Sequence, residues 1–280
     1  MEERKKKEKE FHDGQRTVTE DIHVADTRWS PELESTIKNN PLWANMKYYS
    51  IERKSRSVVL NWLQMNCKGK KALDYCCGNG DDGIFIARNG ASDVTGIDIS
   101  EISIKNCKEK VDSLGLKNIT YRVMDAEALD FENETFDIVT EYGALHHLDL
   151  NKAYSEISRV MKFNGKAICT EALGHNKIFH LYRRLTPHLR TEWEAEHILR
   201  RKDIELAKNY FNRVEILGFF HLATIAAVPF RNLFGFNTML GFLELMDSAL
   251  LKLPLLKWQA WQVVFVLSQP KKETYAKTFI

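Results

Sequence analysis

Apolar runs and amphipathic stretches alternate along the middle of this 280-residue chain. Short apolar runs predict strands at 72–75, 94–99, 119–126, 136–142 and 167–170. Between them lie stripes of apolar residues at helical spacing, for example Ile104, Cys107, Val111 and Leu114. This alternation of strands and helices predicts an α/β fold with a mostly parallel sheet.

The flanking segments extend this core, which we expect over 67–175, into one domain covering 31–280. Their pattern predicts a helix and two further strands, at 51–65, 214–220 and 261–267. Two stretches, about 176–201 and 228–256, are longer than a crossover connection needs. We expect them to be cap insertions over the ends of the strands.

Residues 237–253 have a wide apolar arc with few polar breaks. A helix packed only on a sheet shows a narrower stripe, so the surplus must cover another protein surface, an apolar ligand or a membrane interface. We expect this helix and the 177–201 insertion to cover a pocket that binds a lipophilic substrate. Met239, Phe242 and Met246 share one face and are the expected lining residues. A core-filling insertion or a dimer contact is the alternative.

The first 30 residues carry a mixed-charge run and no apolar segment of the kind that a secretory signal needs. We expect a flexible, solvated tail or a frayed helix there. No apolar run reaches the length of a membrane span. The expected location is cytoplasmic, with weak membrane-surface contact and a homodimer left open.

The composition limits the partners that this chain can have. With 44% hydrophobic residues it can bury one substantial core. Lys and Arg number 40 against 38 Asp and Glu, a net charge of +2, so no overall field favours nucleic acid. Five cysteines without a C-x-x-C pair favour reduced thiols over a disulfide framework.

A glycine-rich turn at 78–83 follows the first expected strand. It satisfies the pattern G-x-G-x-x-G, whose mechanism places a pyrophosphate at a helix N-terminus. Asp81 and Asp82 would put two negative charges where that anion should sit. S-adenosylmethionine has no phosphate and carries cationic groups, so carboxylates are tolerated, and Asp74 can lie near its cationic end.

Carboxylates also stand at the ends of the next two expected strands. Asp98 ends the second strand, about where an acidic residue meets the ribose hydroxyls in nucleotide-binding folds of this kind. Asp125 follows the third strand and fits an adenine amino group. The fourth strand leads into Tyr142 and a segment with two adjacent histidines.

Together these segments resemble the class I S-adenosylmethionine-dependent methyltransferases over residues 71–173. The resemblance rests on LDYCCGNG, Asp98, the turn at 124–126 and FDIVTEYGALHHL, in that order. It implies a seven-stranded, mostly parallel Rossmann-like sheet with one antiparallel strand, helices on both faces and an N-terminal helical extension. Cys76 stands where the usual loop has its first glycine, so the backbone there must accept a side chain. The implied cofactor residues are Asp74, Cys76, Gly78, Gly80, Asp98, Ile99, Asp125, Ala126, Glu141 and Tyr142.

Methyl transfer from a sulfonium needs in-line positioning, and an acceptor that loses a proton also benefits from a base. In an open α/β sheet such groups lie at the carboxyl ends of the strands. This selects His146 and His147 after the fourth strand, and Glu171 and His175 after the fifth. Capping of the next helix or pairing with backbone is the alternative for the two adjacent histidines.

The 177–201 insertion offers two other interpretations. Histidines lie among glutamates there, but their spacing matches no compact zinc pattern, so no metal is expected. Its arginines suit an acidic group on the acceptor, although exposure to solvent or pairing with nearby glutamates is favoured. The residues concerned are His175, His180, His188 and His197, and Arg183, Arg184, Arg190, Arg200 and Arg201.

The sequence therefore predicts an enzyme that moves a methyl group from S-adenosylmethionine to a small, lipophilic organic acceptor. Oxygen is placed ahead of carbon, nitrogen or sulfur as the methylated atom. A protein or RNA methyltransferase is the enzyme alternative, which a strongly basic face would support. A non-catalytic cofactor-binding partner subunit is the other, which an occluded acceptor pocket would support.

Overall fold

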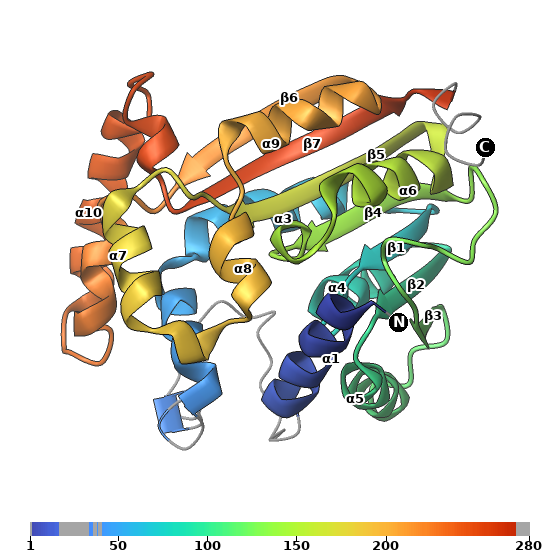
Figure 1. The fold of residues 1–280 in the computed structure, drawn as a ribbon, viewed down its shortest axis with the longest axis horizontal. Coiled ribbons are helices and arrows are strands. Elements are labelled where there is room, and N and C mark those ends of the chain that lie inside the picture. Colours follow the sequence, from blue (N-terminus) through green and yellow to red (C-terminus); the bar gives the residue numbers. More distant parts are fainter. Residues whose placement is uncertain (1, 17–33, 36–37, 39–40, 273–280) are drawn as a thin grey trace.

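A seven-stranded sheet forms the centre of the computed structural model, which describes residues 2–16, 34–35, 38 and 41–272 (Figure 1). The strand order is β3-β2-β1-β4-β5-β7-β6, and β7 runs antiparallel to both of its neighbours. This confirms the expected seven-stranded, mostly parallel sheet. The strands are β1 Lys71–Tyr75, β2 Asp93–Asp98, β3 Ile119–Val123, β4 Phe136–Tyr142, β5 Met161–Ala172, β6 Phe211–Phe220 and β7 Gln262–Pro270.

Helices cover both faces of the sheet because each buries an apolar stripe against it. Val59, Ile84 and Ile104 belong to one buried cluster, which places their helices on one face. Ile157 and Ile204 belong to the cluster on the other face. The helices are α3 Arg53–Asn66, α4 Asp81–Arg88 and α5 Glu101–Ser113 on the first face, and α6 Leu150–Val160 and α9 Arg201–Leu206 on the second.

The N-terminal segment is a helix, one of the two forms expected within residues 1–30, but it is paired with the main domain rather than frayed and solvated. Residues Glu3–Arg16 form helix α1, which lies beside the carboxyl ends of the strands (Figure 1). Its charges are paired across to the main domain: Lys5 Nζ lies 2.7 Å from Asp125 Oδ2, and Lys9 Nζ 2.8 Å from Glu101 Oε1. Residues 17–30 lie outside the described residues.

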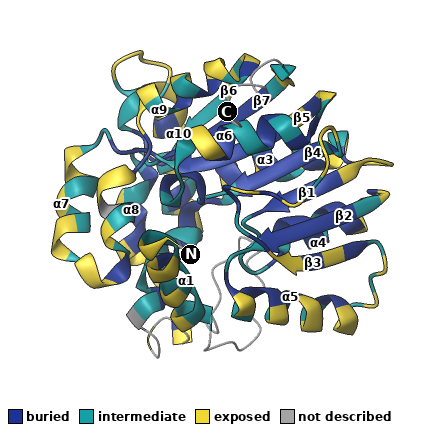
Figure 2. Cartoon of the chain, turned by 45° about the vertical axis from the view of Figure 1, so that its right-hand side comes forward, coloured by how far each residue is buried: buried dark blue, intermediate teal, exposed yellow. Residues whose placement is uncertain are grey.

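Short helices occupy the expected cap insertions. The first insertion contains α7 Lys177–Leu185, η3 Pro187–Leu189 and α8 Glu192–His197, and the second contains the end of η5 Thr224–Phe230 and α10 Phe236–Leu250. Other short helices lie outside the two insertions: η1 Pro41–Ile51, η2 Leu145–His147, η4 Ala207–Asn209 and η6 Lys257–Gln259. Figure 2 shows that α7 is largely exposed or half-buried, and none of its residues is fully buried. Among the described residues, no helix is long and apolar enough to cross a membrane.

Candidate active site

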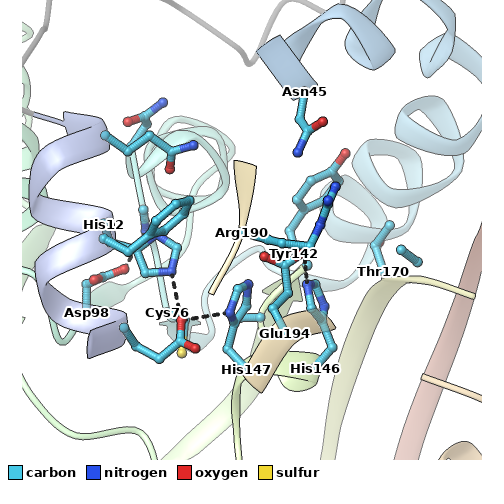
Figure 3. A pocket seen from close by; sticks show the side chains of 18 of the residues that line it. His12, Asn45, Cys76, Asp98, Tyr142, His146, His147, Thr170, Arg190 and Glu194 are labelled. Atoms are coloured by element: carbon cyan, nitrogen blue, oxygen red, sulfur yellow. Dashed lines mark hydrogen bonds and ion pairs between the residues drawn. The ribbon is translucent and has the colours of Figure 1, made fainter. Parts of the chain in front are cut away.

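A cavity of about 390 Å³ lies beyond the carboxyl ends of β1, β2, β4 and β5. Residues of α1, η1, α7 and α8 enclose its other sides. Figure 3 shows His12, Asp98 and Cys76 on one side of it, and His146, Thr170 and Arg190 on the other. The lining therefore combines the ends of the strands with the N-terminal helix and the first cap insertion.

The loop after β1 turns sharply enough to expose its backbone to the cavity. Cys76, Gly78 and Gly80 all have positive φ, at 57°, 52° and 74°. Only glycine adopts this conformation freely, so Cys76 holds the backbone that the usual glycine would have, despite its side chain. Cys76 and Gly78 line the cavity, whereas Gly80 begins α4 beneath it.

Asp98 joins this loop to the start of α5. Its Oδ2 accepts a hydrogen bond from the Gly78 N–H at 3.0 Å, and its Oδ1 accepts from the Ser100 N–H at 2.9 Å. Each carboxylate oxygen retains a further lone pair. Asp98 is therefore held rigidly at the cavity wall with capacity to accept from a ligand hydroxyl.

Asp74 lies below the loop and is almost fully buried. Its Oδ2 accepts from the Gly83 N–H at 2.9 Å, and a Cβ at Gly83 would lie only 2.8 Å from that oxygen. Burial, together with the nearby charge of Asp82, raises the pKa of Asp74 well above its ordinary value. A cationic group beside it would favour the ionised form.

Helix α1 covers the side of the cavity where we expected the adenine. Lys5 Nζ contacts Asp125 Oδ2, while Asp125 Oδ1 accepts from the Glu127 N–H at 2.9 Å. Arg4 pairs with the buried Glu127. Arg16 approaches the cofactor loop, since a Cβ at Gly78 would lie 3.0 Å from its Nη2.

A carboxylate–histidine pair forms where β4 and β5 end: His146, in η2 after β4, lines the cavity, whereas Glu171 on β5 lies behind it and outside the lining. His146 Nδ1 lies 2.7 Å from Glu171 Oε2, and Glu171 Oε1 accepts from the Leu145 N–H at 2.6 Å. Burial, helped by neighbouring His147, lowers the pKa of His146 well below its ordinary value, so its imidazole is neutral at pH 7. Burial raises the pKa of Glu171 to about 7. With Nδ1 donating to Glu171, His146 Nε2 retains a lone pair.

Glu141 supports this pair from behind rather than lining the cavity as we expected. Its Oε1 accepts from the Ala144 N–H at 2.5 Å and from the Leu145 N–H at 3.2 Å. Burial, and Glu171 beside it, raise the pKa of Glu141 well above its ordinary value. Its role is to hold the turn that carries His146.

Glu52, which immediately precedes α3, was not among the site residues expected from the sequence. It is 2% exposed, accepts from the Tyr142 hydroxyl, and accepts from Gln262 Nε2 at 2.9 Å. Burial raises the pKa of Glu52 to about 7. Beside it, Thr170 Oγ1 and Gln262 Oε1 are buried without a hydrogen-bond partner in the described part of the chain. These two atoms are free to bind a polar group of an acceptor.

The cap insertion adds a charged cluster opposite the sheet. Arg183 Nη2 donates to Glu194 Oε1 at 3.1 Å, and Arg190 Nε lies 3.7 Å from the same oxygen. Glu194 Oε1 is 4.0 Å from His146 Nε2. The expected pairing of these arginines with nearby glutamates thus occurs, but inside the cavity wall rather than in solvent.

Glu8, His12 and His147 form a second cluster, with ligand atoms within 4.8 Å of one another. His147 Nδ1 lies 2.9 Å from Glu8 Oε2. Burial would lower the pKa of His147, but its hydrogen bond to Glu8 outweighs burial and raises this pKa above the ordinary value. For His12, burial dominates and lowers the pKa to about 4. Glu8, His12 and Arg16 recur at helical spacing on α1, which was the available sequence signal.

Several expected site residues lie elsewhere. His175 contacts Trp258 and accepts from the Arg201 N–H at 3.3 Å, away from the cavity lining. Met239, Phe242 and Met246 are also absent from the lining. The expected lining face was wrong, because α10 packs through Phe236, Leu240, Glu244 and Asp247 and leaves Phe242 and Met246 exposed.

A family model described as "Methyltransferase domain" matches residues 66–215, which is more than half of the chain. The chain belongs to the class I S-adenosylmethionine-dependent methyltransferases. S-adenosylmethionine is the cofactor of this family, which confirms the cofactor expected from the sequence. The exposed backbone of the Cys76–Gly78 turn and the carboxylates of Asp74, Asp98 and Asp125 fit a ligand with hydroxyls and cationic groups.

Relatives and solved structures agree with membership of the methyltransferase family. Demethylmenaquinone methyltransferases from Bacillus cytotoxicus and Staphylococcus aureus are each 40% identical, over 124 and 107 residues. These matches cover 41% and 37% of this chain, and 52% and 44% of the relatives, so the chain spans about half the length of the curated relatives it matches.

A crystal structure of geranyl diphosphate C-methyltransferase from Streptomyces coelicolor has a TM-score of 0.59 at 14% identity, covering 95% of this chain and 97% of that one. A protein from Pyrococcus horikoshii has a TM-score of 0.50 at 22% identity, covering 88% and 94%. At these identities the likeness shows the methyltransferase fold.

Proposed function

We propose that this protein transfers the methyl group of S-adenosylmethionine to a small, lipophilic acceptor that carries a hydroxyl group. The observation that carries the proposal is the His146–Glu171 pair, at 2.7 Å, in which His146 lines the cavity that also contains the cofactor loop. A base and a cofactor site in one enclosed space suit a transfer that removes a proton from the acceptor.

The cofactor end of the cavity consists of the Cys76–Gly78 turn and three carboxylates. Asp98 would accept from the ribose hydroxyls, Asp125 from the adenine amino group, and Asp74 would lie near the cationic end. When bound there, S-adenosylmethionine supplies an activated methyl group whose leaving group is a neutral thioether. The protein needs only to align the acceptor and receive its proton.

His146 is the residue best placed to receive that proton. Its Nε2 takes the proton of the acceptor hydroxyl, while Nδ1 donates to Glu171 and shares the resulting positive charge. The acceptor oxygen freed of its proton could then accept the methyl group, leaving the cofactor as the neutral thioether. If a ring carbon conjugated to that oxygen accepted the methyl group instead, this carbon would afterwards lose its own proton and the oxygen would regain the one held by His146. Glu171 thus orients and stabilises His146 without touching the acceptor.

The walls between these groups support a lipophilic acceptor. Ala172, Leu189, Ile198 and Ile225 line the cavity, and Thr170 and Gln262 offer unpartnered oxygens at its floor. An apolar body with one or two polar groups fits this lining. The curated relatives are named for demethylmenaquinone, which is consistent with such an acceptor.

The two alternatives receive less support. A protein or RNA substrate would have to reach His146 past α1 and the cap insertion, whose residues line the cavity. A non-catalytic partner subunit would need the cofactor end of this cavity, but not the buried His146–Glu171 pair beside it.

The test is to supply purified protein with methyl-labelled S-adenosylmethionine and a short-tailed demethylmenaquinol. The same compound with its ring hydroxyls blocked as ethers serves as the control. We expect label only in the product of the free hydroxyl compound, and the position of the new methyl in its NMR spectrum identifies the methylated atom. Equal labelling of the ether would contradict the role of the hydroxyl.

A further inference from the structure

Exposed apolar side chains gather in two segments of the cap. Eleven of the fifteen large apolar residues exposed in the described part of the chain lie in α7 or between residues 230 and 255. On α7 they are Ile178, Leu181 and Leu185, and in the second segment Phe230, Leu233, Phe234, Phe242, Leu245, Met246, Leu253 and Leu255. Single exposed apolar residues are ordinary, but a concentration of this kind marks an interaction surface.

On helix α10, charged side chains face inward and apolar side chains face outward, the opposite of a helix on a water-facing surface. Its carboxylates point inward: Glu244 pairs with Arg53, whose Nε lies 2.6 Å from Glu244 Oε1, and Asp247 accepts from the Thr224 hydroxyl at 2.8 Å. Phe242 and Leu245 point outward and are 63% and 69% exposed. The sequence therefore places its charges inside and its apolar residues outside.

The turn before α10 carries the most exposed of these residues. Phe234 is fully exposed, and it precedes Gly235, whose φ of 84° makes the tight entry into the helix. Leu233 beside it is 60% exposed. A projecting pair of large apolar side chains gains little from water and much from an apolar phase.

The exposed charges within these two segments have one sign. Helix α7 contains no carboxylate, and the two carboxylates of residues 224–257, Glu244 and Asp247, are each 6% exposed. Lys177, Arg184 and Lys252 are exposed. Both fully described segments thus present apolar and cationic groups to solvent, and no anionic ones.

We propose that α7 and residues 230–255 form a surface that docks on a lipid bilayer containing anionic lipids. Anionic headgroups complement the exposed lysines and arginine, while Phe234, Phe242 and Leu245 enter the boundary of the acyl chains. A symmetric contact between two copies would instead bring these cations against one another. Both segments lie at the same end of the molecule (Figure 1), where Asn176 Nδ2 before α7 donates to Gln259 O at 3.0 Å.

Docking would place the cavity next to the bilayer. Phe179 and Tyr182 line the cavity from one face of α7, while Ile178, Leu181 and Leu185 occupy its exposed face. One helix therefore separates the acceptor site from the lipid. This link to acceptor entry rests on the proposed function, but docking itself is measured without turnover.

The experiment is sedimentation of the full chain with vesicles of phosphatidylcholine alone or mixed with phosphatidylglycerol. We expect stronger binding to the mixed vesicles, weakened by salt. The double variant Phe234→Ser, Phe242→Ser should lose about tenfold or more in binding, because two exposed anchors are removed without disturbing the core. Phe163→Ser is the matched control, since Phe163 is 58% exposed on β5 outside both segments.

The variant Lys177→Glu, Lys252→Glu should lose the preference for phosphatidylglycerol. Absence of binding to either vesicle, or an equal loss with Phe163→Ser, would overturn the proposal. Concentration-dependent dimerisation that the Phe234, Phe242 variant abolishes, without vesicle binding, would assign the surface to a second copy instead. Methylation of a detergent-dispersed acceptor should persist in all these variants, which separates failure of docking from failure of the proposed function.

Discussion

At the scale of single residues, Asp98 links the cofactor loop to the rest of the sheet. It holds the Gly78 and Ser100 N–H groups at once, and Ser100 Oγ in turn accepts from the Ser103 N–H at 3.0 Å to cap α5. The carboxylate is thereby fixed before any ligand arrives. Because this side chain is already ordered, binding a ligand hydroxyl does not cost the conformational entropy of ordering the carboxylate.

Replacing Asp98 with alanine should weaken binding of S-adenosylmethionine by about tenfold or more, because hydrogen bonds to a charged group contribute roughly 1.5–3 kcal/mol. Asp112→Ala, at an exposed position of α5, is the control. Calorimetry on both folded variants gives the comparison. Equal affinities would remove Asp98 from the cofactor site.

His221 makes a different prediction, concerning stability. It is 2% exposed between Ser55 Oγ, at 2.9 Å, and Thr224 Oγ1, at 3.1 Å, and burial lowers its pKa to about 3. Below about pH 6.5, therefore, this histidine binds a proton in the unfolded chain but stays neutral in the folded chain. The free energy of unfolding should fall by up to about 1.4 kcal/mol per pH unit between pH 6 and 4 from this residue.

Urea unfolding at several pH values measures that slope. His221→Asn keeps a hydrogen-bonding side chain and suits the φ of 67° at this position. This variant should be less stable at pH 7 but should lose the histidine's share of the acid sensitivity. An unchanged slope would mean that other groups cause it.

At the scale of elements, the strands of the core could be predicted because apolar runs ending in carboxylates are local signals, and the seven-stranded, mostly parallel sheet was implied by the family resemblance. Asp98, Asp125 and His146 line the cavity, as expected, because each lies at the end of a strand or in the loop that follows it. The position of helix α1 over the cavity, and that of Glu52 beside Tyr142, could not be predicted from local pattern, because they depend on partners far away in the sequence. The expectation for Met239 and Phe242 was wrong because the inner face of α10 buries two carboxylates, whereas the inner face of a helix is usually apolar.

Deleting residues 1–16 should accelerate cofactor release by about tenfold or more while leaving the domain folded. Glu8 is the one fully buried residue of α1, so the deletion removes no hydrophobic core. It does remove Lys5 and Arg16 from the cofactor side of the cavity. Stopped-flow displacement measures the rate, and Lys6→Ala, exposed on the same helix, is the control. Unchanged release would mean that α1 does not cover the cofactor.

At the scale of the whole molecule, the groups assigned to cofactor binding and to proton transfer lie at different ends of the cavity. The carboxylates of Asp74, Asp98 and Asp125 lie at one end, and His146, supported from behind by Glu171, lies at the other. The sheet fixes the distance between them because β1, β4 and β5 are neighbours. Binding and chemistry should therefore respond to different substitutions.

The measurement that tests this account most directly is the turnover of His146→Gln beside its affinity for S-adenosylmethionine. We predict a loss of about a hundredfold or more in turnover, because a positioned base contributes about that much, with cofactor affinity nearly unchanged. His175→Gln, outside the cavity lining, should keep wild-type turnover. Turnover of His146→Gln within a few-fold of the wild type would contradict the central claim that His146 receives the acceptor's proton.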